Sequence, residues 1–175
     1  MGNWHLHFLV YYVMIKQKPL EVNNMTRAEH AAELFASGYN CAQAVAIAFC
    51  DLTGFTQEQT AKMLAPFGGG FGRLREVCGA VSGMTFVYGC LYGYETPNSE
   101  AQMHVYETEQ ALAAQFREKA GSIVCRDILK NPPSDPVPSP RTEEYYATRP
   151  CVRMVYTATS ILDDYISAHP LQKDN

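Results

Sequence analysis

Apolar residues recur at helical spacing along most of the chain, and residues that start or stop helices bound each periodic segment. The segment 26–37 opens on Thr26 and Glu29, which have the spacing of a capping box, and ends before Gly38. Similar signals predict further helices at 41–52, 56–65, 76–92, 99–119, 123–130 and 150–166. No run of alternating β-branched residues bounded by hairpin turns competes with them. The pattern predicts an all-α fold, a compact bundle of about six to seven helices.

Two segments lie outside this helical pattern. Residues 131–141 hold five prolines and predict a Pro-rich loop before the last helix. Residues 1–24 combine an apolar run without a clean period and a polar spacer, and Met25 stands directly before the first predicted helix. We interpret 1–24 as an N-terminal extension outside the fold, 25–170 as a single helical domain and 171–175 as a tail, and we hypothesise that Met25 is the functional start.

Composition narrows the classes of protein that fit. A chain of 175 residues with 47% hydrophobic content can bury one sizeable core. The net charge of -4, without a basic run, argues against nucleic-acid binding. The apolar stretch 4–15 is shorter than a membrane span and lacks the features of a signal peptide, so we expect no membrane span and a cytoplasmic location. In that compartment, cysteines favour metal binding or reversible redox chemistry over structural disulfides.

Four of the six cysteines fall in first turns of predicted helices: Cys41, Cys78, Cys125 and Cys151. Unpaired N–H groups and the positive end of the helix dipole favour the thiolate there, which predicts lowered pKa values. We expect these four to form one redox or metal-binding site. Taken singly, each is also explained as a small buried apolar residue. Cys50 and Cys90 lie toward the far ends of their predicted helices, and we interpret them as core or accessory residues.

The spacings between the four cysteines exclude the common local motifs. They are 37, 47 and 26 residues, so there is no C-x-x-C pair of the thioredoxin type and no close pair of the zinc-ribbon type. The site must therefore be assembled by folding. Four remote thiolates suit an iron–sulfur centre or two exchangeable dithiol pairs.

The sequence around these cysteines resembles the C_GCAxxG_C_C family, a bacterial and archaeal family described as putative redox-active proteins. The segments that carry the resemblance are 38–45, 67–73, 76–83, 121–126 and 151–153. It spans about 25–166 and implies a redox role for the four cysteines. Related domains fused to cytochrome modules look like hosts for iron–sulfur clusters. The chain departs from the family in its N-terminal extension and in the additional Cys50 and Cys90.

Residues near the cysteines suggest how a ligand would be held. Gly79 and Gly83 lie four residues apart on the helix after Cys78, which either lets a cofactor approach or lets another helix pack closely. Arg73 and Arg75 either supply positive charge to the thiolates or face solvent. The glycine-rich loop 68–72 lacks the lysine of a phosphate-binding P-loop, so a tight turn is its better interpretation.

Three functions fit these residues. The first is an electron-transfer protein in which Cys41, Cys78, Cys125 and Cys151 ligate an iron–sulfur cluster, with Gly79, Gly83 and Arg73 around it. The second is a cofactor-free thiol-disulfide oxidoreductase or redox sensor. The third is a structural or transport-associated protein whose cysteines bind zinc or another soft metal. The expected partner is a redox protein or a small thiol, and the sequence leaves open the cofactor, the oligomeric state and whether the protein is an enzyme.

Overall fold

The structure is a computed structural model that describes residues 25–171, and it confirms the all-α class. No strand occurs within this range. The interpretations of 1–24 as an extension and of the last residues as a tail lie outside the described residues. The elements are α2 (Arg27–Ala36), α3 (Cys41–Ile47), α4 (Cys50–Thr53), α5 (Gln57–Leu64), the 3-10 helix η2 (Ala65–Phe67), α6 (Gly79–Tyr92), α7 (Ser99–Ala120), α8 (Cys125–Ile128), α9 (Glu143–Thr148) and α10 (Cys151–Ala168).

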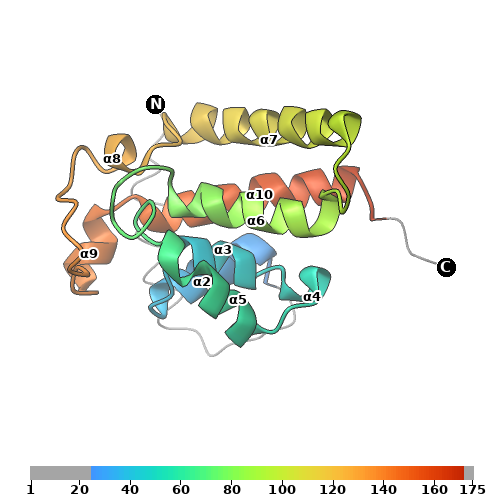
Figure 1. The fold of residues 1–175 in the computed structure, drawn as a ribbon. Helices are drawn as coiled ribbons and strands as arrows, with labels where there is room; N and C mark the ends of the chain where they lie inside the picture. The colour runs from blue at the N-terminus through green and yellow to red at the C-terminus, as the bar shows by residue number, and fades with distance from the viewer. Residues whose placement is uncertain (1–24, 172–175) are drawn as a thin grey trace.

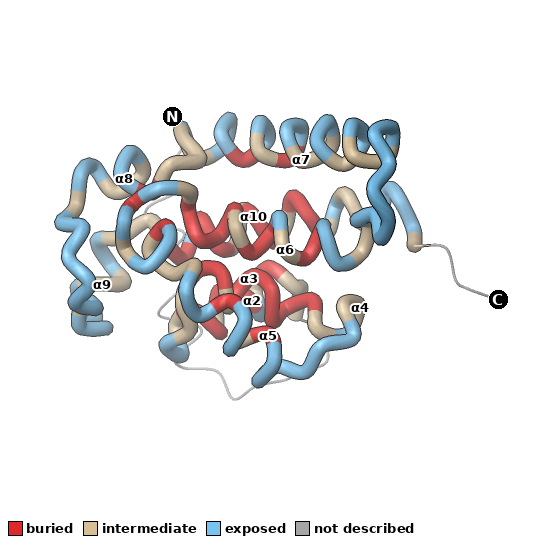
Figure 2. Tube along the Cα trace, in the orientation of Figure 1, coloured by how far each residue is buried: buried red, intermediate tan, exposed pale blue. Residues whose placement is uncertain are grey.

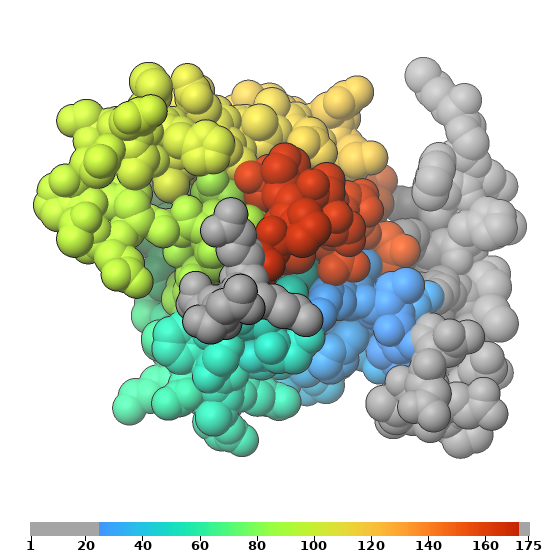
Figure 3. Space-filling model, turned by 90° about the vertical axis from the view of Figure 1, so that its right-hand side faces the viewer, coloured from blue at the N-terminus to red at the C-terminus, as the bar shows by residue number. Residues whose placement is uncertain are grey.

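The helices pack in three layers. In Figure 1, α6 and α10 lie between the long helix α7 and a layer formed by α2, α3 and α5. Buried residues are concentrated in α2, α3, α6 and α10 (Figure 2), and the largest fully buried side chains are Tyr88, Phe35, Phe49 and Phe116. Figure 3 shows the last turns of α10 reaching the surface between α7 and α2. No helix in the described range is long and apolar enough to cross a membrane.

The predicted helix starts at Thr26, Asn40 and Thr56 are confirmed, because each side chain caps its helix in a complete capping box. Asn40 also connects two elements: its Nδ2 donates to the carbonyls of Leu64 and Ala65, at 3.3 and 3.1 Å. This contact fixes the start of α3 against the end of α5.

The prediction of one continuous helix over 41–52 is wrong. The guanidinium of Arg27 donates a 2.8 Å hydrogen bond to the Ala48 carbonyl. In a continuous helix, this carbonyl would accept a hydrogen bond from the N–H of Leu52. That N–H turns instead to the Phe49 carbonyl, at 2.9 Å. The helix ends at α3 and restarts as α4, so Cys50 begins a helix rather than ending one.

The helix predicted over 76–92 also begins later than expected. Val77 and Val124 form an isolated antiparallel bridge. The N–H of Cys78 donates to the Ile123 carbonyl at 2.8 Å, and the N–H of Cys125 donates to the Glu76 carbonyl at 2.6 Å. Extended backbone is therefore required on both sides of the bridge, which shortens the predicted helices to α6 and α8.

The proline-rich segment 131–141 contains no helix, and α9 follows it before α10 begins. The sequence analysis missed α9, whose N-cap Thr142 accepts from the N–H of Tyr145. Figure 1 shows this segment, α8, α9 and the glycine-rich loop gathered at one end of the helical layers. The candidate site lies at that end.

Candidate site in an arginine-lined cavity

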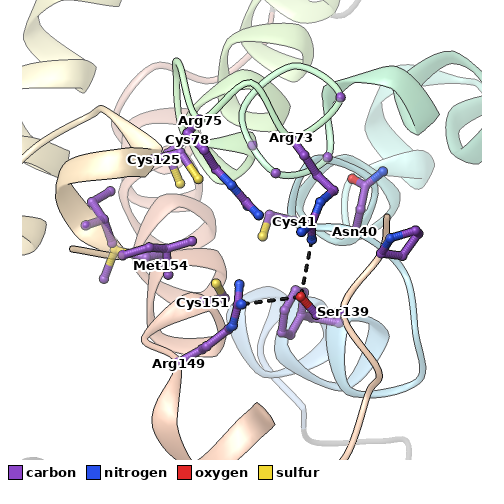
Figure 4. Close-up of a pocket in the computed structure, with 18 of the residues that line it drawn as sticks. Asn40, Cys41, Arg73, Arg75, Cys78, Cys125, Ser139, Arg149, Cys151 and Met154 are labelled. Carbon is purple, nitrogen blue, oxygen red and sulfur yellow. Dashed lines mark hydrogen bonds between the residues drawn. The ribbon is translucent and has the colours of Figure 1, made fainter. Parts of the chain in front are cut away.

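The structure brings the four predicted cysteines to one cavity of about 270 Å³. Cys41, Cys125 and Cys151 are the first residues of α3, α8 and α10, and Cys78 is the N-cap of α6. All four side chains are buried and none is in a disulfide. Figure 4 shows their sulfur atoms facing the same space from four separate elements.

Two glycines let the start of α6 lie close to the start of α3. A Cβ at Gly79 would lie 3.1 Å from the Cβ of Cys41, and a Cβ at Gly83 would lie 2.6 Å from the Ala42 carbonyl oxygen. Gly79 also lines the cavity, whereas Gly83 faces α3. The bare backbone of α6 therefore serves helix packing, and through that packing it brings Cys78 toward Cys41.

Cys41 and Cys151 form the first of two thiol pairs. Interaction with the Cys151 thiol, and after it burial, raises the pKa of Cys41, while the same interaction lowers the pKa of Cys151. Burial opposes the lowering at Cys151, while the guanidiniums of Arg149, Arg141 and Arg75 add to it. Cys151 is thus the thiol of the pair that ionises more readily.

Cys78 and Cys125 form the second pair, held by the two backbone hydrogen bonds beside the Val77–Val124 bridge. Their side chains lie next to each other in Figure 4. Burial raises the pKa of Cys78 to about 12, against the opposing effect of the N–H groups at the start of α6. Burial also raises the pKa of Cys125, and the nearby Arg75 guanidinium partly offsets it.

The prediction that helix starts lower the pKa of all four cysteines is therefore wrong for Cys41, Cys78 and Cys125. At Cys41 the largest cause of the raised pKa is the neighbouring Cys151 thiol, followed by burial. At Cys78 and Cys125 burial is the largest cause, and it outweighs the helix N–H groups at Cys78 and the Arg75 guanidinium at Cys125. Only Cys151 follows the expected direction, and its largest cause is the Cys41 thiol.

The glycine-rich loop delivers two arginines to the cavity. The backbone of the loop and of the residues that follow it is left-handed at several positions between 69 and 75, among them Arg73 and Arg75. A Cβ at Gly70 would lie 2.8 Å from the Cβ of Cys125, so this turn requires a glycine. Arg75 is only 3% exposed, and its Nε donates to the Pro133 carbonyl at 2.9 Å. Arg73 donates through Nε to the Asp135 carbonyl at 2.6 Å.

Two further arginines that the sequence analysis missed, Arg141 and Arg149, line the same cavity. Their guanidinium carbons lie 5.0 and 4.8 Å from the ring centroid of Tyr145. The hydroxyl of Ser139 accepts from Arg73 at 3.2 Å and from Arg149 at 3.3 Å (Figure 4). These residues flank α9, and nothing in their local sequence distinguishes them from surface arginines.

Cysteine is a suitable ligand for iron–sulfur clusters and for zinc, but the arrangement of these four side chains differs from that of a metal site. Within residues 25–171, no three histidine, cysteine, aspartate or glutamate side chains are placed to hold a metal ion. Of the remaining cysteines, Cys50 is half-buried with its sulfur 3.3 Å from the Thr60 hydroxyl oxygen. Cys90 is exposed, which excludes the core role and leaves the accessory role of the two that were expected for it.

Comparison with known families agrees with this site. The family described as "Putative redox-active protein (C_GCAxxG_C_C)" matches residues 39–165, which include all four cavity cysteines. The chain belongs to this family. Neither a curated protein nor a solved structure gave a significant match. The family description supports redox activity in general, and the chemistry of the site has to be argued from its own geometry.

Proposed function

We propose that the protein is a cofactor-free thiol-disulfide redox protein in which Cys41 and Cys151 cycle between dithiol and disulfide. The observation that carries the proposal is the convergence of Cys41 and Cys151 on one cavity, where the interaction between the two thiols lowers the pKa of Cys151 and raises that of Cys41. A thiol with a lowered pKa is more often present as the thiolate, which is the nucleophilic form. The start of α10 and the surrounding guanidiniums act in the same direction.

Each residue of the pair has a distinct role in exchange. The Cys151 thiolate attacks one sulfur of a substrate disulfide, whose S–S bond breaks as a mixed disulfide forms and the first substrate thiolate leaves with the bond's electron pair. Cys41 then loses its proton and attacks the Cys151 sulfur, releasing the second substrate thiolate. The protein pair is oxidised by two electrons and the substrate disulfide is reduced by the same two.

Cys78 and Cys125 supply a second exchangeable pair. Both are less disposed to ionise than Cys151, since burial raises their pKa values. Thiols with raised pKa values are poor attacking groups at neutral pH. We therefore assign this pair the later role of passing electrons to or from the Cys41–Cys151 disulfide.

Metal analysis and thiol counting test the proposal. We expect protein purified without oxygen to be colourless and free of stoichiometric iron, sulfide and zinc, and to lose thiols in pairs on oxidation. Stoichiometric iron and sulfide with a visible chromophore would replace the proposal by the iron–sulfur alternative. Stoichiometric zinc would replace it by the structural-metal alternative.

Single substitutions separate the roles within the first pair. Cys151→Ser is expected to abolish exchange with a model disulfide, because the attacking sulfur is gone. Cys41→Ser is expected to stop at the mixed disulfide, which mass spectrometry detects as a retained adduct. Cys90→Ser is the matched control, being an exposed cysteine outside the cavity. Unchanged exchange in Cys151→Ser would contradict the assignment.

A further inference from the structure

The wall of the cavity carries charge of one sign only. Its lining residues include four arginines, Arg73, Arg75, Arg141 and Arg149. Among the described residues that line it there is no aspartate, glutamate, lysine or histidine. A cavity wall lined by guanidiniums is suited to binding carboxylate, sulfonate or phosphate oxygens in a bidentate manner.

The Arg75 guanidinium has a buried N–H donor that lacks an acceptor in the described part of the chain. Its residue is 3% exposed, its Nε is used by the Pro133 carbonyl, and its Nη2 is buried without a hydrogen-bond partner within residues 25–171. A buried, charged donor without an acceptor is costly, and native proteins rarely keep one without a functional reason. Figure 4 shows the Arg75 side chain reaching into the cavity between the cysteines.

The guanidiniums of Arg141 and Arg149 are held in place by neutral groups, which leaves their charge available to a ligand. Arg141 donates to the carbonyls of Phe35 and Tyr39 at 3.4 and 3.2 Å, and Arg149 donates to the Ser139 hydroxyl. Neutral acceptors and aromatic rings fix the orientation of these side chains without cancelling their charge. Arg73 differs from them, because its guanidinium forms an ion pair with Asp135 at 3.5 Å.

The geometry points to a substrate class: a small disulfide whose S–S bond is flanked by anionic groups. This inference rests on the proposed function. Anionic groups bound to Arg75, Arg141 and Arg149 would lie beside Cys151, since the same guanidiniums act electrostatically on that sulfur. The substrate itself is the oxidant: its S–S bond breaks to give two anionic thiolates, while the Cys41–Cys151 bond forms and two thiol protons are released.

Three disulfides of similar length and different charge test the selectivity. Reduced protein is mixed with dithiodipropionate, which is dianionic, with neutral hydroxyethyl disulfide, or with dicationic cystamine, and loss of thiols is followed. At low salt we expect the dianion to react at least about tenfold faster than the neutral compound and the dication to react slowest. Added salt should reduce the differences between the three rates. The rate of thiol loss with tetrathionate, compared with that for dithiodipropionate, distinguishes an inorganic from an organic anionic substrate.

Arginine variants link the selectivity to the cavity. Arg75→Gln and Arg149→Gln are each expected to weaken binding of the unreactive thioether dianion thiodipropionate by about tenfold or more, as loss of a charge-assisted hydrogen bond does. Arg75→Lys should restore part of it. Arg117→Gln, at an exposed position of α7, is the matched control and should leave binding unchanged. If burial of Arg75 makes its variants fail to fold, Arg149→Gln carries the test.

The outcomes separate this inference from the proposed function. Exchange that is equally fast with all three disulfides, or fastest with cystamine, overturns the anionic substrate and leaves the thiol-disulfide function standing. Failure to exchange with any disulfide overturns both. Binding of thiodipropionate that is unaffected by Arg149→Gln and Arg75→Gln overturns the arginine assignment.

Discussion

The pKa values of two thiols that share one cavity are shifted in opposite directions. Interaction with the Cys41 thiol and with three nearby guanidiniums lowers the pKa of Cys151. Helix N–H groups lower the pKa of Cys78, but burial has the larger effect and raises it to about 12. Position at a helix start is common to both, so the neighbouring side chains decide which thiol becomes the nucleophile.

Burial of Cys78 predicts that stability falls in alkaline solution. Its folded-state pKa of about 12 lies above the ordinary value of 9.0, so the unfolded chain ionises first. The stabilisation is fully present below pH 9.0 and is lost as the pH rises toward 12, with a slope of about 1.4 kcal/mol per pH unit for one proton. Urea denaturation of the reduced protein at a series of pH values measures the slope.

Cys78→Ser is the control for this slope, because a serine hydroxyl does not ionise in that range. We expect the variant to have a shallower slope, and a slope identical to that of the parent would contradict the role given to Cys78. Some slope should persist, since burial also raises the pKa of Tyr145 to about 12 and the pKa of Cys41 is raised too.

At the scale of the element, local signals predicted the helices well, whereas tertiary contacts set the exceptions. Thr26, Asn40 and Thr56 are caps whose function depends on the next three residues alone, so the sequence is sufficient to find them. The break at Ala48 depends on Arg27, which lies a helix away in sequence. Neither that break nor the Val77–Val124 bridge has a local signature.

The same distinction applies to the candidate site. The four cysteines could be predicted because each stands at a helix start, which is a local property. Their division into two pairs could not, because the Cys78–Cys125 pair depends on a bridge between remote segments. Arg141 and Arg149 reach the cavity only through the path of the proline-rich segment and α9, which no spacing rule specifies.

Two glycines of α6 offer a matched test of its packing on α3. A Cβ at Gly83 would lie 2.6 Å from the Ala42 carbonyl oxygen and 3.0 Å from the Cβ of Val45, so Gly83→Ala must separate the helices. We expect it to lower the free energy of unfolding by about 1–3 kcal/mol. Gly89→Ala lies on the same helix with nothing within 4 Å, and it should be neutral or stabilising by up to about 1 kcal/mol.

Chemical denaturation of both variants and the parent gives the comparison. Because α6 also carries Cys78 at its start, Gly83→Ala is expected to slow thiol exchange as well, while Gly89→Ala leaves it unchanged. Equal stability of the two alanine variants would show that close approach of α6 to α3 is not what Gly83 provides.

At the scale of the whole molecule, the two thiol pairs join parts of the fold that are far apart in the chain. Cys41 and Cys151 connect the start of α3 to the start of α10, the last helix of the core, across roughly 110 residues. Cys78 and Cys125 connect the start of α6 to α8, across the long helix α7. Oxidation of either pair therefore closes a loop that contains much of the helical core.

This topology predicts that the oxidised protein is more stable than the reduced one. Closing a loop of roughly 110 residues removes conformational freedom mainly from the unfolded chain, a stabilisation of about 2–4 kcal/mol if the native structure accepts the bond without strain. Urea denaturation with and without a reductant measures it. Cys41→Ser should lose most of the gain and Cys90→Ser none. An oxidised protein less stable than the reduced one would mean that the disulfide strains the junction of α3 and α10. By linkage, the folded protein would then favour the dithiol, and the Cys41–Cys151 disulfide would be an oxidant that accepts electrons, which would contradict the reducing direction of the proposed exchange.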